Sequence, residues 1–160
     1  MIWCIGELTT EYRQRMYALL ELYARPYDAR EPVICLDEKS KQLLRETRRP
    51  LPAKPGGTLL RQDYEYARAG TCNVFVAVEP RGQRQHAQVT DRRTKVDFVG
   101  FVRQLSRRRY AQARKVHLVM DNLNTHGRAS FDAVLGVKTT AALLRRIEFH
   151  YTPKHASWLN

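Results

Sequence analysis

Two short apolar runs in this sequence each end in an aspartate, at residues 33–37 (VICLD) and 116–121 (VHLVMD). Apolar runs of this length are typical of strands that are buried on both faces, as in the parallel sheets of α/β proteins. In open sheets of that kind, ligands bind at the carboxyl ends of the strands. The two runs therefore predict an α/β fold in which Asp37 and Asp121 mark a functional edge.

The net charge of the chain indicates the kind of partner that it binds. Its 160 residues include 28 Lys and Arg against 16 Asp and Glu, a net charge of +12. Such a basic domain favours polyanionic partners, and nucleic acid is the first candidate. A ribosome-associated or merely basic protein is the alternative that charge alone leaves open. No apolar run is long enough for a membrane span and no signal peptide is visible, so we expect no membrane partner and a cytoplasmic location.

The rest of the sequence predicts a mixed order of helices and strands. Residues 38–70 show no clear pattern of helix or strand, and within them residues 48–57 are basic and rich in proline and glycine, which predicts an irregular loop. Right-handed crossovers would place the strands at 32–37 and 116–121 side by side. The expected elements are a helix from Thr9 or Thr10 to Arg25 with Thr10 as its cap, strands at 32–37, 71–79 and 84–90, a helix from a capping box at Thr94 to about Tyr110, a strand at 116–121, helical pieces to about Arg146 interrupted at Gly136, and a strand at 147–151.

Asp37 and Asp121, once adjacent, would suit a divalent cation. Mg²⁺ and Mn²⁺ prefer oxygen ligands, and a site with few protein ligands leaves positions for water and phosphate. Two such ions about 3.5–4 Å apart activate a nucleophile and stabilise a leaving oxygen. Either aspartate alone is better explained as a cap for the following loop or helix. The pair, in so basic a chain, favours the metal-binding interpretation.

Three segments carry a family resemblance: CLDEKS (35–40), LVMDNLNTH (118–126) and HYTPKHASWLN (150–160). They resemble the catalytic blocks of mariner-like DDE transposases of bacterial insertion sequences, within the retroviral-integrase or RNase H-like superfamily. The resemblance implies an RNase H-like mixed sheet with helices on both faces. It implies Asp37 and Asp121 as the first two catalytic carboxylates, with two Mg²⁺ or Mn²⁺ ions as cofactors. It also implies transposon-end and target DNA as partners, a homo-oligomer, and a bacterial, nucleoid-associated location.

In that family the third carboxylate is a Glu on the helix after the SWLN segment, and this sequence ends at Asn160. Glu148 lies on the last predicted strand and is not assigned to the triad. We therefore expect residues 31–160 to form a catalytic domain truncated before its last helix. Residues 1–30 are expected to form a helical lead-in, the tail of a missing DNA-binding region. A downstream fragment of the same transposase would then be a further partner, and the chain alone is expected to have little or no strand-transfer activity.

Further side chains are candidates for DNA contact, to phosphates without sequence readout. Solvated surface charges and, for Asn122 and His126, loop hydrogen bonds are the alternatives. Glu38 is either next to the metal or on the surface, Trp158 is expected to pack, and His150 and His155 do not have the spacing of a zinc motif. The expected DNA-contacting residues are Arg48, Arg49, Lys54, Arg107, Arg108, Asn122, His126, Lys154 and His155.

Two other functions stay open for this sequence. One is a non-catalytic, DNA-binding remnant of a transposase, and the other is an RNase H-like nuclease unrelated to transposition. The block at 150–160 disfavours the nuclease. The third carboxylate distinguishes the enzyme from the remnant, so whether this chain is itself an enzyme stays open.

Overall fold

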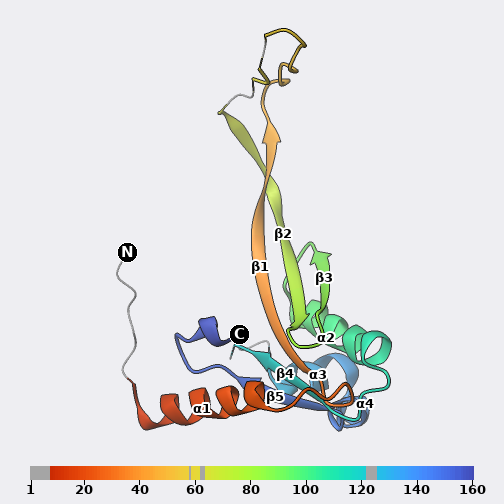
Figure 1. Cartoon of the computed structure of the whole chain (residues 1–160). Coiled ribbons are helices and arrows are strands. Elements are labelled where there is room, and N and C mark those ends of the chain that lie inside the picture. The colour runs from red at the N-terminus through yellow and green to blue at the C-terminus, as the bar shows by residue number, and fades with distance from the viewer. Residues whose placement is uncertain (1–7, 58, 62–63, 122–125) are drawn as a thin grey trace.

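The fold is centred on a five-stranded mixed sheet with the order β3-β2-β1-β4-β5 (Figure 1). It is seen in a computed structural model that describes residues 8–57, 59–61, 64–121 and 126–160. β1 pairs antiparallel with β2 and parallel with β4, so the predicted adjacency of the two aspartate-bearing strands is confirmed. The strands are β1 (Val33–Glu46), β2 (Tyr66–Glu79), β3 (Arg84–Thr90), β4 (Val116–Met120) and β5 (Ile147–Tyr151).

Helices cover both faces of the sheet, as predicted. Successive side chains of a strand point to opposite faces. Ile34 and Leu118 accordingly pack into the large core with α2 and α3, whereas Cys35 and Val119 pack beneath α1. None of the helices in the described ranges is both long and apolar enough to cross a membrane. The helical segments are α1 (Thr10–Ala24), α2 (Lys95–Gln104), the π-helical turn η1 (Leu105–Arg109), α3 (Arg128–Leu135), α4 (Val137–Leu144) and the 3₁₀ turn η2 (Ser157–Leu159).

The α2 face holds the main core. α2 begins with the predicted capping box, in which the Thr94 hydroxyl accepts from the Asp97 amide and the Asp97 carboxylate accepts from the Thr94 amide. This start directs Phe98 and Phe101 into the core, where both are fully buried. Gly136, with φ of +77°, separates α3 from α4 and confirms the predicted interruption, since a positive φ favours glycine.

In the described part of the chain, α1 and the end of η2 cover the α1 face. The cap of α1 is Thr9 and not the predicted Thr10, because Thr9 has the extended backbone of a cap and its hydroxyl accepts from the Tyr12 amide at 3.1 Å. Leu19 and Leu22 of α1 pack with Val119 and Leu159. The Tyr23 hydroxyl also donates to the Leu159 carbonyl at 2.6 Å, which ties the end of the described chain to α1.

β1 and β2 extend beyond the rest of the sheet as a long two-stranded arm, which we define as residues 43–70 (Figure 1). Sequence patterns assigned no element to residues 38–46 and 66–70 on either side of the expected loop, and the structure places them in β1 and β2. Side chains there are mostly exposed on both faces, so no apolar alternation marked the strands. A bulge separates the arm from the body, with Ala69 and Gly70 of β2 opposite Leu43 of β1, and Gly70 has a φ of +95°.

Candidate functional site

Asp37 and Asp121 occupy equivalent positions on neighbouring parallel strands. The register pairs Val33 with His117 and Cys35 with Val119. Two residues further along each strand, Asp37 is level with Asp121, and neighbouring strands lie about 4.8 Å apart. Asp121 follows the last residue of β4 as predicted, while Asp37 lies within the longer β1 rather than at its end. The parallel register thus places the two predicted aspartates side by side along neighbouring strands.

The Asp121 carboxylate is held by a buried histidine. His126 Nδ1 lies 2.8 Å from Asp121 Oδ1, and the His126 ring stacks on Phe98 with 4.5 Å between ring centroids. Because His126 has no exposed surface, the prediction that it contacts DNA is wrong. The alternative of a local hydrogen bond fits better: His126 connects the core of the α2 face to Asp121 and fixes the orientation of its carboxylate.

Glu38 belongs to the same buried group. Its side chain is only 6% exposed, so it is not the surface glutamate that we considered from the sequence. Glu38 Oε2 lies 3.6 Å from His126 Nε2, and Glu38 Oε1 lies 3.4 Å from Arg93 Nη1. Alternation along β1 directs Glu38 to the face opposite Asp37. Glu38 therefore lies beside His126, which fits the alternative of a group near the metal better than a surface position. Arg93 and Phe98 were missed by sequence reasoning.

The end of the described chain lies beside Asp37. The Asn160 side chain donates from Nδ2 to the Leu36 carbonyl at 2.6 Å. Leu159 is buried against Val119, whereas Trp158 is 63% exposed, so the expected packing of Trp158 is wrong. Asp37 itself is exposed, and its Oδ1 accepts from the Glu38 amide at 2.8 Å. One side of the aspartate pair is therefore bordered by the 157–160 segment.

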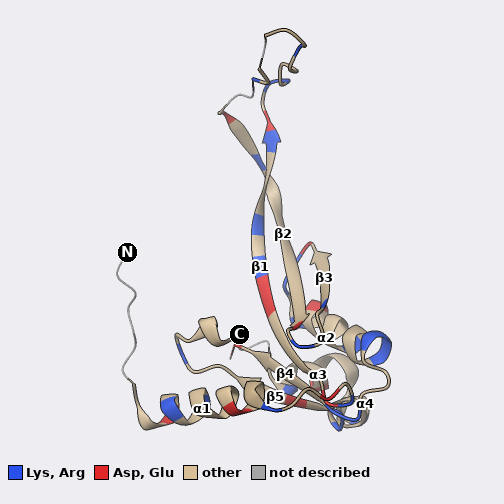
Figure 2. Ribbon diagram, viewed as in Figure 1, with Lys and Arg blue, Asp and Glu red and all other residues tan. Residues whose placement is uncertain are grey.

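The structure does not gather the predicted DNA-contacting residues into one patch (Figure 2). Arg48, Arg49 and Lys54 lie in the arm, Arg107 and Arg108 on η1, and Lys154 and His155 in the loop between β5 and η2. All seven are exposed. Asn122 lies outside the described residues. Exposure is what phosphate contact requires, but the contacts themselves stay predictions.

A comparison with protein families identifies the chain. The model of the DDE superfamily endonuclease family matches residues 32–160, which includes both aspartates and the 150–160 block. The chain belongs to this family. Among curated protein sequences, no significant match was found.

Solved structures of Mos1 transposase have a similar fold. The Mos1 mariner paired-end complex with Mn matches with a TM-score of 0.57 and 18% identity over 95% of this chain and 45% of that chain. The paired-end complex with the left transposon end gives 0.51 and 14% over 98% and 46%, and the strand transfer complex gives 0.51 and 15% over 96% and 44%. These likenesses confirm the predicted RNase H-like fold. The chain spans less than half the length of the chains it matches.

Proposed function

We propose that this chain is the catalytic domain of a mariner-like DDE transposase. Such an enzyme, when complete, cleaves DNA and transfers the cleaved strand. The observation that carries the proposal is the parallel register that sets Asp37 level with Asp121. Membership of the DDE superfamily endonuclease family supports it, as does the likeness to the Mos1 fold. In this proposal the two aspartates bind metal, and His126 holds the Asp121 carboxylate in its binding orientation.

The donor set fits a hard divalent cation. Asp37 is exposed and the Asp121 side chain is 38% exposed, so both carboxylates are open to solvent. Carboxylate oxygens and water are the ligands that Mg²⁺ and Mn²⁺ prefer. We propose two such ions in the complete site, where they would activate the attacking oxygen and stabilise the leaving oxygen. Neither aspartate can be replaced by the nearby Glu38, because Glu38 faces the opposite side of β1 and is occupied by Arg93 and His126.

A third carboxylate would complete the site. We place it in the segment that follows Asn160 in a longer protein or in a separate fragment, because the Asn160–Leu36 hydrogen bond brings that position next to Asp37. Glu148 does not fit this role: it pairs in register with His117, near the start of β4 and about 13 Å along the strand from Asp121. With two carboxylates, metal binding would be weak, and we expect little or no strand transfer by residues 1–160 alone.

DNA is the proposed partner. The exposed basic groups of the arm, η1 and the 152–156 loop would contact phosphates. Because transposition joins two transposon ends to a target, we propose that the complete protein works as a homo-oligomer. We also propose a bacterial protein that acts in the cytoplasm, at the nucleoid, where its DNA substrate is.

Metal binding tests the proposal most directly. Mn²⁺ titration followed by electron paramagnetic resonance should show at least about a tenfold loss of affinity in Asp121→Asn, and about a tenfold loss in His126→Gln. Asp132→Asn is the matched control, since Asp132 lies on α3 and pairs with Arg128 at 3.6 Å. If Asp121→Asn binds Mn²⁺ as tightly as the unaltered chain, the aspartate pair is not the metal site.

A DNA cleavage assay tests the catalytic claim separately. The unaltered chain is incubated with DNA in Mg²⁺ or Mn²⁺ beside Asp121→Asn and Asp132→Asn. Weak or absent cleavage by all three is the expected result. Cleavage that Asp121→Asn abolishes would support the catalytic role and disprove the expected low activity. Equal, robust cleavage by the unaltered chain and Asp121→Asn would contradict the catalytic role of the pair.

A further inference from the structure

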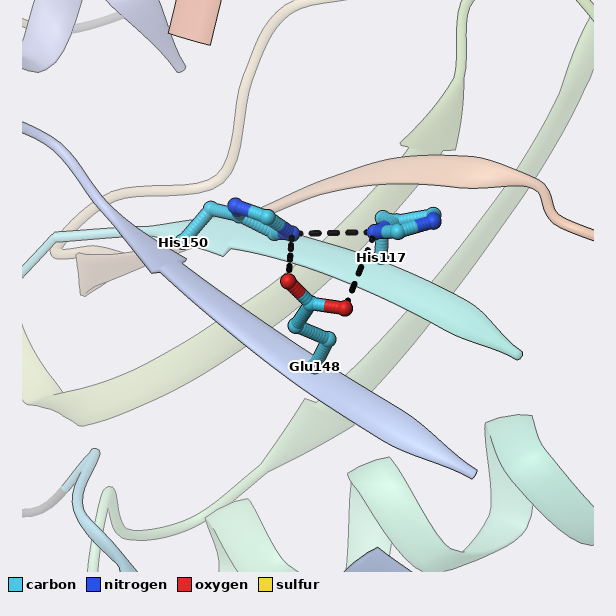
Figure 3. A group of neighbouring side chains, drawn as sticks. All are labelled: His117, Glu148 and His150. Atoms are coloured by element: carbon cyan, nitrogen blue, oxygen red, sulfur yellow. Dashed lines mark hydrogen bonds and ion pairs between the residues drawn. The ribbon is translucent and has the colours of Figure 1, made fainter. Parts of the chain in front are cut away.

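A second group of potential metal ligands lies on the α1 face of the sheet, away from Asp37 and Asp121. β4 and β5 run parallel, with His117 opposite Glu148 and Val119 opposite His150. Glu148 and His150 are two residues apart on one strand, so their side chains share a face. Figure 3 shows the three side chains converging from the two strands, with the two imidazole rings in contact and the Glu148 carboxylate facing both of them.

The distances in this group are close to those of a metal site. His117 Nδ1 lies 3.0 Å from His150 Nε2 and 3.8 Å from Glu148 Oε2, while His150 Nε2 lies 3.7 Å from Glu148 Oε1. One ligand atom from each residue lies within 4.8 Å of the others. In a tetrahedral zinc site with bonds of 2.0–2.1 Å, ligand atoms are about 3.3 Å apart. Shifts of a few tenths of an ångström would therefore accommodate an ion.

The surroundings keep the histidines available as ligands. Burial lowers the pKa of both His117 and His150, while the neighbouring Glu148 raises it and offsets part of this shift. Neutral imidazole is the form that binds metal. His117 lines a pocket with Tyr27 and Glu31, and His150 lines another with Leu19, so each imidazole borders a cavity.

One charge competes with an ion. Lys115 Nζ lies 2.9 Å from Glu148 Oε2, and this hydrogen bond is the main cause of the lowered pKa of Glu148. It keeps Glu148 ionised, and it leaves Oε1 directed toward His150. The Glu148 side chain is 46% exposed, so a small rotation can present either oxygen to an ion.

We propose that His117, Glu148 and His150 bind one divalent transition-metal ion of the Zn²⁺ class, with His117 Nδ1, His150 Nε2 and a Glu148 carboxylate oxygen as ligands. Three protein ligands leave a fourth tetrahedral position for water. Imidazole ligands select Zn²⁺ over Mg²⁺, so this site and the oxygen-lined aspartate pair take different ions. The ion would tie the edge strand β5 to β4. This site does not depend on the proposed transposase function.

Metal retention tests the site on the Asp37→Asn/Asp121→Asn double variant, which removes ions bound at the aspartate pair. After Zn²⁺ loading and dialysis, elemental analysis should find about one Zn²⁺ per chain, which excess Mg²⁺ does not displace. Co²⁺, which substitutes for Zn²⁺, should give the visible absorption of a tetrahedral ion. Zn²⁺ should also raise the melting temperature, because an ion that binds only the folded state stabilises it.

Ligand variants then assign the site. Adding Glu148→Gln or His150→Gln to the double variant should lower Zn²⁺ affinity at least about tenfold and abolish the Zn²⁺-induced rise in melting temperature. His155→Gln is the control, since His155 is exposed in the loop after β5. Circular dichroism checks folding, and Glu148→Gln, at a half-exposed position, should fold normally. If the double variant retains no Zn²⁺, or if Glu148→Gln and His150→Gln retain as much as the His155 control, the three residues form only a hydrogen-bonded group.

Discussion

On one face of the sheet, beneath α2, α3 and α4, alternate residues of β1 and β4 join a continuous apolar core that includes Phe98 and Phe101. On the other face, beneath α1, the intervening residues of the same strands meet a smaller apolar cluster around Leu19 and Leu22. Polar side chains such as His117 and Tyr23 lie on this second face. Each of these strands therefore contacts two different environments. Because the α2 face holds the larger apolar core, the α1 face can accommodate ionisable groups.

The difference shows how this small domain combines stability with chemistry. Burial of apolar area contributes roughly 25 cal/mol per Å², so the larger core supplies most of the stabilisation. Asp37 lies on the strand face that α1 and the 157–160 segment border, where Leu159 packs. His126, in contrast, reaches Asp121 from the α2 face. The edge that carries Asp37 and Asp121 is thus exposed, but Asp121 is held by His126 from the side of the larger core.

The largest expected effect comes from removing a ring from the main core. Phe101 is fully buried and stacks on Phe75 with 5.4 Å between ring centroids. Phe101→Ala should lower the free energy of unfolding by about 3–5 kcal/mol, measured by urea denaturation. Leu22→Ala, on the α1 face, should cost less, about 2–3 kcal/mol, because its smaller cluster can relax. A greater loss from Leu22→Ala than from Phe101→Ala would reverse the proposed ranking of the two faces.

A smaller effect is expected from His86, whose ring stacks on Phe101. Burial lowers the pKa of His86, Arg109 lowers it further, and its Nε2 has no hydrogen-bond partner among the described residues. Above about pH 6.5, His86 is neutral in both states. As the pH falls below that value, the unfolded chain gains the proton first, so stability decreases until the pH passes the folded-state pKa.

His86→Gln should therefore flatten the acid limb of the stability profile between the unfolded- and folded-state pKa values of His86. Urea denaturation across pH 5 to 8 in the presence of a chelator measures this slope. His155→Gln, at an exposed position, is the matched control and should leave the slope unchanged. If His86→Gln has the same slope as the unaltered chain, protonation of His86 does not destabilise the folded protein.

The smallest effect on stability is expected in the arm, which belongs to neither face. Arg48, Arg49 and Lys54 are exposed, and Arg48 pairs with Glu65 only at the surface. The triple substitution to Ala should change the free energy of unfolding by less than about 0.5 kcal/mol. If the three groups contact DNA phosphates, it should also reduce the slope of log affinity against log salt by up to about 2.7. An unchanged salt slope would remove the arm from the DNA interface.

The aspartate pair was predictable because its signals are local. An apolar run that ends in Asp marks a buried strand, and the handedness of crossovers sets the neighbours. The capping box at Thr94 and the break at Gly136 were predictable for the same reason, since each depends on adjacent residues. From these features the order of the elements and the positions of the two aspartates could be predicted.

The remaining features depend on contacts across the fold. Residues 38–46 form a strand whose backbone pairs with β2, and their exposed polar side chains carry no period that predicts it. His126 and Glu38 lie far apart in the sequence and meet only in the folded chain, which spacing does not indicate. His117 and His150 are 33 residues apart and meet only through the register of β4 and β5. A zinc-motif search along the sequence examines short spacings and misses such a pair.

The bulge at Gly70 has a consequence for how this protein can change. A strand that slips by one residue turns every later side chain to the opposite face. On the body side of the bulge, pairs from Cys35–Val78 to Gln42–Thr71 keep one continuous register, with Asp37 opposite Val76. The irregular step confines any slip or length change to the arm. We therefore expect that the arm can be lengthened or shortened by mutation while Asp37 keeps its register with Val76.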